Sequence, residues 1–142
     1  MTNRLSFVFA LICIALLTGC VNREQADAKL AKACKAAVEV FLPEDQRIDT
    51  IKDATFTPSP EGPDFRHVTI HTVMIDGWLE AEYDYDCVFQ EGFGFLNSGY
   101  TASIEKVRIN DETIGRSGNE ILGDADDFIK MTDAVRESLY SN

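Results

Sequence analysis

The chain has 142 residues, of which 24 are acidic and 13 are lysine or arginine, so its formal net charge at pH 7 is −11. This balance argues against nucleic acid as a partner, because phosphate backbones are bound by clustered cations. It also disfavours adsorption to anionic lipid headgroups. A basic partner, a cation or simple solubility is compatible with it.

The N-terminal segment has the pattern of an export signal. Arg4 is the one charged residue ahead of an apolar run from Phe7 to Leu17. This run is too short to span a bilayer, which needs about 20 apolar residues. We therefore expect residues 1–19 to be a signal peptide that is removed, taking Cys13 with it.

The run closes with Leu17-Thr18-Gly19-Cys20. These residues resemble the lipobox of bacterial lipoproteins, in which small residues admit the signal peptidase and the cysteine thiol is acylated. The resemblance covers only residues 1–20 and implies a mature chain that begins at Cys20 and is bound to the membrane through lipid. One acyl chain binds only marginally at about 0.8 kcal/mol per buried methylene, so two chains make the stable anchor. An ordinary soluble secretory signal is the alternative.

The lipobox resemblance also implies a location. Val21 stands where the family's inner-membrane retention signal has an aspartate. In a bacterium with two membranes we therefore expect a lipid-anchored envelope protein on the outer membrane, facing the periplasm. In a bacterium with one membrane, we expect it on the outer face of that membrane. Residues 20–25 would form a short tether and residues 26–142 a single domain.

Removal of residues 1–19, which carry the single charge of Arg4, leaves 123 residues and a net charge of −12. That length suits one modest domain. Cys34 and Cys87 are the cysteines that follow Cys20. Export places them in an oxidising compartment, so we expect them to form a disulfide. The chain-entropy model gives about 4 kcal/mol for so long a loop.

Apolar residues from Ala26 to Phe41 recur at helical spacing and predict an amphipathic helix that ends before Pro43. Cys34 lies on its apolar stripe. After the helix, Ile48–Thr57 predicts a weak strand, and residues 58–63 a proline-rich loop.

The strongest local pattern is a β-hairpin. Two β-rich segments, Phe65–Ile75 and Trp78–Gln90, flank Asp76-Gly77, a dipeptide typical of two-residue hairpin turns. With this turn, residues whose numbers sum to 153 should face one another. The register predicts an apolar core face and a polar face that meets water.

Cys87 falls on the predicted core face of the hairpin, with Val68 and Ile70. Packing of the helix against this face would bring Cys34 and Cys87 into one seam, as a disulfide requires α-carbons within about 7 Å. A helical core cysteine followed by Tyr85-Asp86-Cys87 also resembles small uncharacterised exported bacterial proteins. That resemblance implies no function.

His67 and His71 fall on the polar face, opposite Asp86 and Glu82. Four residues along a strand span about 13 Å, so the two imidazoles cannot share one metal ion. Each can instead meet its cross-strand carboxylate. That contact would raise the proton affinity of the imidazole or form a weak zinc or copper site, with a solvated charge ladder as the alternative.

A row of acids, Glu80, Glu82, Asp84 and Asp86, also occupies the polar face, with side chains about 7 Å apart. Paired carboxylates at such separations occur in glycoside hydrolysis, which also needs a substrate cleft. The sequence has no nucleophile elbow, Walker loop or Rossmann glycine pattern. We therefore expect a non-enzymatic protein without catalytic residues, metal site or cofactor.

Beyond the hairpin, the apolar Phe93–Leu96 segment of a glycine-rich loop would either pack on the domain or bind a partner. Tyr100–Asn110 predicts a third strand with a bulge near Glu105-Lys106, where the apolar phase changes. Asp111–Gly123 is expected to be a polar loop.

The C-terminal segment predicts a second helix from Asp124 to Tyr140, with Asp124 as its N-cap. Asp126 and Asp127 suit the positive end of the helix dipole better than a calcium loop, because the glycine and distal glutamate of such a loop are missing.

Together these features predict an α+β fold in which an N-terminal helix packs on a three- to four-stranded antiparallel sheet, with a C-terminal helix. The predicted function is a membrane-anchored envelope lipoprotein that acts as a non-enzymatic interaction or accessory module. Its partner would be an unknown envelope protein, bound through the polar face or Phe93–Leu96. The alternatives are a metal- or cation-binding protein that uses His67, His71 and the facing acids, and a small envelope hydrolase.

Overall fold

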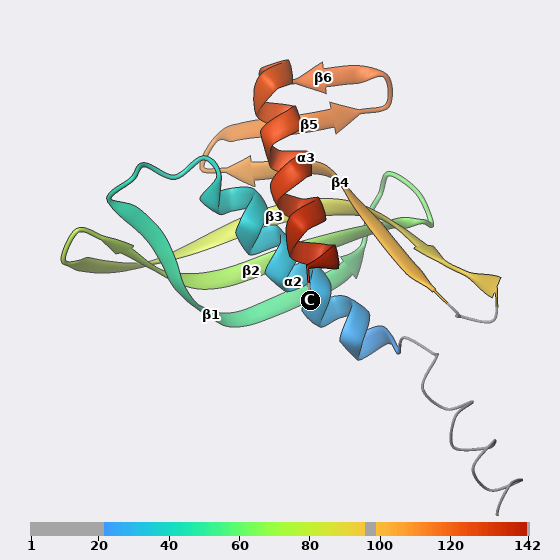
Figure 1. Cartoon of the computed structure of the whole chain (residues 1–142), viewed down its shortest axis with the longest axis horizontal. Helices are drawn as coiled ribbons and strands as arrows, with labels where there is room; N and C mark the ends of the chain where they lie inside the picture. Colours follow the sequence, from blue (N-terminus) through green and yellow to red (C-terminus); the bar gives the residue numbers. More distant parts are fainter. Residues whose placement is uncertain (1–21, 96–98, 142) are drawn as a thin grey trace, which may run out of the picture.

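The computed structural model describes residues 22–95 and 99–141 (Figure 1). Helix α2 (Arg23–Glu39) is followed by six strands and by helix α3 (Ala125–Tyr140). The strands are β1 (Gln46–Pro58), β2 (Phe65–Asp76), β3 (Leu79–Phe93), β4 (Tyr100–Ile109), β5 (Glu112–Ser117) and β6 (Glu120–Leu122). The predicted signal peptide, residues 1–19, and the predicted lipidation site Cys20 lie outside the described residues.

All six strands form one antiparallel sheet in chain order. The α+β class is confirmed, whereas the expected three to four strands were too few. The predicted polar loop 111–123 is instead the β5–β6 hairpin at the sheet edge. Both strands are short, and β5 is mostly polar, so they do not show the apolar alternation by which a strand is recognised.

The two helices lie on the same face of the sheet (Figure 1). α2 contacts β1 to β4, α3 contacts β4 to β6, and the two helices contact each other. The core fills the space between helices and sheet, and its largest fully buried side chains include Leu30, Ile70, Phe89 and Met131. The opposite side is called the open face; on β2 and β3 it carries His67, Thr69, His71, Glu82, Asp84 and Asp86.

A capping box starts α2 at Arg23. The Asn22 side chain accepts a hydrogen bond from the Gln25 amide at 2.8 Å, and the Gln25 side chain accepts one from the Asn22 amide at 3.3 Å. These bonds satisfy amide groups that have no partner within the helix. The expected tether 20–25 is therefore wrong for residues 23–25, which are helical. Val21 and Asn22 alone separate Cys20 from the first helical residue.

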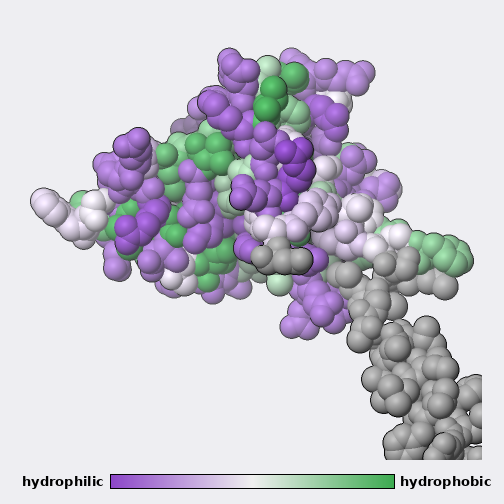
Figure 2. Space-filling model, in the orientation of Figure 1, coloured by the Kyte–Doolittle hydropathy of each residue, from purple (hydrophilic) through white to green (hydrophobic). Residues whose placement is uncertain are grey.

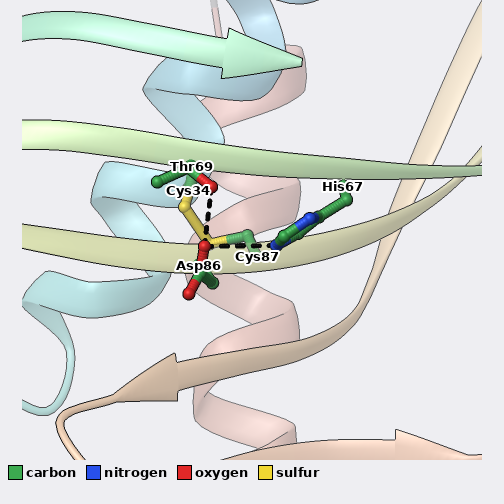
Figure 3. The surroundings of a disulfide bond; sticks show 5 residues. All are labelled: Cys34, His67, Thr69, Asp86 and Cys87. Atoms are coloured by element: carbon green, nitrogen blue, oxygen red, sulfur yellow. Dashed lines mark hydrogen bonds and ion pairs between the residues drawn. A yellow bond between two sulfur atoms is a disulfide. The ribbon is translucent and has the colours of Figure 1, made fainter. Parts of the chain in front are cut away.

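A disulfide joins α2 to β3. Cys34 lies among the buried residues of α2, and its sulfur bonds to that of Cys87, with 5.8 Å between the α-carbons. The predicted pair is thus present. Figure 3 shows the bond on the helix side of β3, next to Asp86, whose side chain points to the open face.

The β2–β3 register differs by two residues from the prediction. Asp76 pairs with Leu79, so Gly77 and Trp78 form the turn and paired residue numbers sum to 155. With the turn one residue later, Gly77 is the residue with a positive φ, of 62°, and Asp76 does not need a positive φ. Because side chains alternate with a period of two, every residue keeps its predicted face.

The predicted bulge in β4 is confirmed. Val88 pairs with Lys106 and Phe89 with Ile104, which leaves Glu105 as the extra residue. Gly115 of β5 lies against this bulge with φ of 149°, and a Cβ there would come 2.3 Å from the Glu105 carbonyl oxygen. Glycine is therefore required at position 115.

Candidate functional site

Asp86 is the centre of a polar cluster on the open face. Its carboxylate accepts a hydrogen bond from the Thr69 hydroxyl at 2.6 Å, lies 3.1 Å from Nε2 of His67 and pairs with Arg108 (Figure 3 shows the first two). Burial by itself would raise the pKa of Asp86. The hydrogen bonds from Thr69 and Arg108 outweigh burial, so the pKa lies below its ordinary value and the group stays ionised.

An open hollow of about 480 Å³ adjoins the Asp86 cluster. It is lined by His67 and Asp86 on one side and by Lys106, Arg108 and Leu122 on the other. Lys106 pairs with Glu61 and Arg108 with Asp86, so the cations of this hollow are already compensated. The surface offers both donors and acceptors, together with an apolar patch.

His71 forms a second cluster on the open face. Its Nδ1 contacts Asp84 and its Nε2 lies 3.1 Å from Glu82, while the ammonium of Lys52 lies 2.5 Å from Glu82. Hydrogen bonds to Asp84 and Glu82 raise the pKa of His71. Hydrogen bonds from Lys52 and His71 lower the pKa of Glu82. The arrangement therefore favours the imidazolium form.

The predicted contacts His67–Asp86 and His71–Glu82 are both present, although the register prediction was wrong. In the actual register His67 faces Val88 and His71 faces Asp84, so the two predicted acids are diagonal neighbours. Diagonal cross-strand side chains remain within reach of each other.

The contacts of His71 bear on the metal-binding alternative. A metal needs an unprotonated ring nitrogen, and both nitrogens of His71 face carboxylates. Across residues 22–95 and 99–141, no group of three or more His, Cys, Asp or Glu side chains is arranged to hold a metal ion.

The Asp86 cluster also differs from a nucleophilic triad. In a triad the hydroxyl donates to the imidazole, and the carboxylate orients that imidazole from its other side. Here the Thr69 hydroxyl donates directly to Asp86. The geometry assembles a charge-compensated surface cluster in which the Thr69 hydroxyl is bonded to the carboxylate and not to the imidazole of His67.

A third cluster, which the sequence did not predict, lies where α2 begins. Arg23 donates to both carboxylate oxygens of Glu91, at 2.7 and 3.0 Å, and also to Asp27. Asp27 in turn pairs with Arg66 of β2 at 3.2 Å, and the Tyr100 hydroxyl donates to Glu91 at 2.6 Å. The hydrogen bond to Glu91 is the main cause of a raised pKa at Arg23. No local pattern marks residues 68 apart as partners.

The aromatic end of the β3–β4 hairpin adjoins this Arg23 cluster. The Arg23 guanidinium lies 5.5 Å from the centre of the Phe93 ring, which is itself 5.2 Å from the Tyr100 ring. Phe93 is 41% exposed and Phe95 is 85% exposed. Burial, one of the two expectations for this loop, is therefore wrong for Phe95. Leu96 lies outside the described residues.

Trp78 marks the opposite end of the sheet. The prediction made it the first residue of a strand, but it occupies the β2–β3 turn and is 93% exposed. The turn was predicted one residue too early. This error shifted the register and also placed Trp78 in a strand, so its exposure was not predicted.

Comparison of the chain with protein-family models, with curated proteins and with solved structures gave no match. Among the described residues, neither helix is both long and apolar enough to span a membrane.

Proposed function

We propose that this protein is a bacterial envelope lipoprotein, anchored through lipid on Cys20, that acts as a non-enzymatic interaction or accessory module. The observation that carries the proposal is the position at which helix α2, the first described element, begins. The capping box at Asn22 starts the domain two residues after the cysteine that closes the lipobox-like Leu17-Thr18-Gly19-Cys20. An anchor at Cys20 would hold the domain directly against the bilayer.

The disulfide supports an extracytoplasmic location. Cys34 and Cys87 are bonded through the core, and such bonds persist in oxidising compartments such as the periplasm. A lipoprotein exported before it folds would form this bond outside the cytoplasm.

The open face is the surface that we propose for a protein partner. The helices leave it uncovered, and its Asp86 and His71 clusters hold charged side chains in fixed positions. Fixed, partly compensated charges favour orientation and selectivity over raw affinity. With a net charge of −12 after cleavage, the protein suits a partner with a basic surface.

Cell fractionation tests the anchor. Wild-type protein should partition into detergent with the membrane fraction. The Cys20→Ser variant should instead be found in the soluble periplasmic fraction. A Cys13→Ser variant is the matched control and should behave as wild type. Equal partitioning of the Cys20→Ser and wild-type proteins would refute the proposal.

Photo-crosslinking tests the surface. A crosslinking amino acid at Asp84 on the open face should yield a defined adduct in intact envelopes, and one at Glu137 on the exposed side of α3 should not. Identical adducts from the two positions would contradict a role for the open face.

A further inference from the structure

We propose that the aromatic end of the β3–β4 hairpin, Phe93 and Phe95, inserts into the membrane interface as a second, non-covalent contact with zwitterionic lipid. The inference rests on the proposed lipid anchor at Cys20. It adds that the domain has one fixed orientation on the bilayer, with this end of the sheet against the lipid.

The chain between the proposed anchor and the domain is short. Cys20 precedes Arg23 by three residues, and an extended chain spans at most about 3.3–3.6 Å per residue, or roughly 11 Å in all. A lipid-bearing Cys20 therefore keeps Arg23 within the thickness of the headgroup layer and its immediate surroundings.

Arg23 is bonded to the end of β3 in the β3–β4 hairpin. Arg23 donates two hydrogen bonds to Glu91, and its guanidinium lies against the Phe93 ring. These contacts join the start of α2 to the end of β3. Whatever holds Arg23 at the membrane surface holds Phe93 there as well.

The end of the β3–β4 hairpin exposes aromatic side chains. Phe95 is 85% exposed and Phe93 is 41% exposed. Figure 2 shows apolar surface at the right of the molecule, where Figure 1 places the end of the β3–β4 hairpin. Exposed aromatic side chains of this kind suit the boundary between headgroups and acyl chains. The nearby charges are paired, since Arg23 is bound by Glu91 and Asp27, and Asp27 also pairs with Arg66. A zwitterionic surface therefore meets no uncompensated charge from this cluster.

A hollow of about 550 Å³ opens beside the hairpin end. Apolar side chains, among them Pro63, Phe65 and Phe93, line it together with two cations and two acids, Arg23, Arg66, Asp64 and Glu91. The hollow therefore combines apolar side chains with charges of both signs, a mixture that is compatible with a zwitterionic lipid surface.

The test uses tryptophan fluorescence of the full acylated chain in dioleoylphosphatidylcholine vesicles, with and without bromine on the acyl chains. The native Trp78 is the single tryptophan of the chain. It lies at the far end of β3 from Phe93, at most about 50 Å away at about 3.3 Å per residue of strand, and is the built-in control. In a Trp78→Phe background, Phe95→Trp moves the reporter to the proposed contact.

Brominated lipid should quench the Phe95→Trp reporter severalfold more than Trp78 of the wild-type protein, and the emission of this reporter should shift to the blue. Circular dichroism checks that the variant is folded. Equal quenching at the two positions in protein that floats with the vesicles would overturn the hairpin contact but leave the anchor intact. Protein that does not float would overturn the anchor and, with it, this contact.

Discussion

Arg23 and Glu91 form a two-bonded ion pair, with 2.7 Å between Nη2 and Oε1, which joins the first residue of α2 to the end of β3. The Glu91 side chain is only 9% exposed, so this carboxylate depends on Arg23 and the Tyr100 hydroxyl for its partners. The pair fixes where the chain enters the fold. It places the start of α2 at one end of the sheet, and Trp78 lies at the other end.

Arg23→Ala should lower the free energy of unfolding by about 1–2 kcal/mol, because it removes a charge-assisted partner from a nearly buried carboxylate. Partial exposure of Arg23 limits the loss. Urea denaturation measures it. Arg136→Ala is the matched control, since its pair with Asp133 is exposed on α3, and should cost under about 0.5 kcal/mol. Equal losses would contradict the structural role of Arg23.

Loss of the Cys34–Cys87 disulfide should lower the free energy of unfolding by about 2–4 kcal/mol, because the bond closes a loop between residues 53 apart. The Cys34→Ala, Cys87→Ala double variant should show this loss in thermal unfolding. Dithiothreitol should destabilise the wild-type protein by a similar amount and leave the double variant unchanged. A wild-type melting temperature that is insensitive to reduction would argue against the bond.

Gly115→Ala should destabilise the fold by about 2–4 kcal/mol. The new methyl group would overlap the backbone of Glu105 and Lys106 at the β4 bulge, and the φ of 149° disfavours any side chain. Gly118→Ala is the control, because Gly118 also has positive φ but faces open space. It should cost only about 1 kcal/mol. The bulge geometry is wrong if both variants unfold at the same urea concentration.

The ion pairs of His71 should make stability depend on pH. The folded state raises the pKa of His71 above 6.5, so its contribution is fully present below the unfolded value and is lost as pH rises through the folded value. The stability difference between wild type and His71→Gln should therefore shrink as pH rises above about 6.5. NMR titration of the His71 ring measures the pKa directly. The pKa of His71 should be lower in the Asp84→Asn variant than in the wild type. An identical titration curve in that variant would refute the pairing of His71 with Asp84.

Several elements were predictable because their signals are local. The helix carrying Cys34 shows clear apolar spacing, and Asp124 caps α3 as expected, accepting a hydrogen bond from the Asp126 amide. The bulge at Glu105 follows from a change of apolar phase within one strand. The disulfide was predictable because Cys34 and Cys87 fell on apolar faces that had to meet.

Other elements depended on contacts that no local pattern reveals. The β5–β6 hairpin exists because the edge of β4 that faces away from β3 is free to pair with β5, and because Gly115 tolerates close approach to the bulge. The turn position depends on whether Gly77 or Asp76 takes the positive φ, a choice that the dipeptide alone leaves open. The Arg23–Glu91 pair joins distant residues, and only the folded sheet places them together.

Intact-mass spectrometry of the native protein, extracted with detergent from its own membranes, distinguishes a lipid-anchored chain from an unmodified one. We expect a chain that begins at Cys20 and carries the added mass of acyl chains, with Cys34 and Cys87 oxidised. A native chain with an unacylated N-terminus would contradict the lipid anchor, the fixed orientation on the bilayer and the proposed function together.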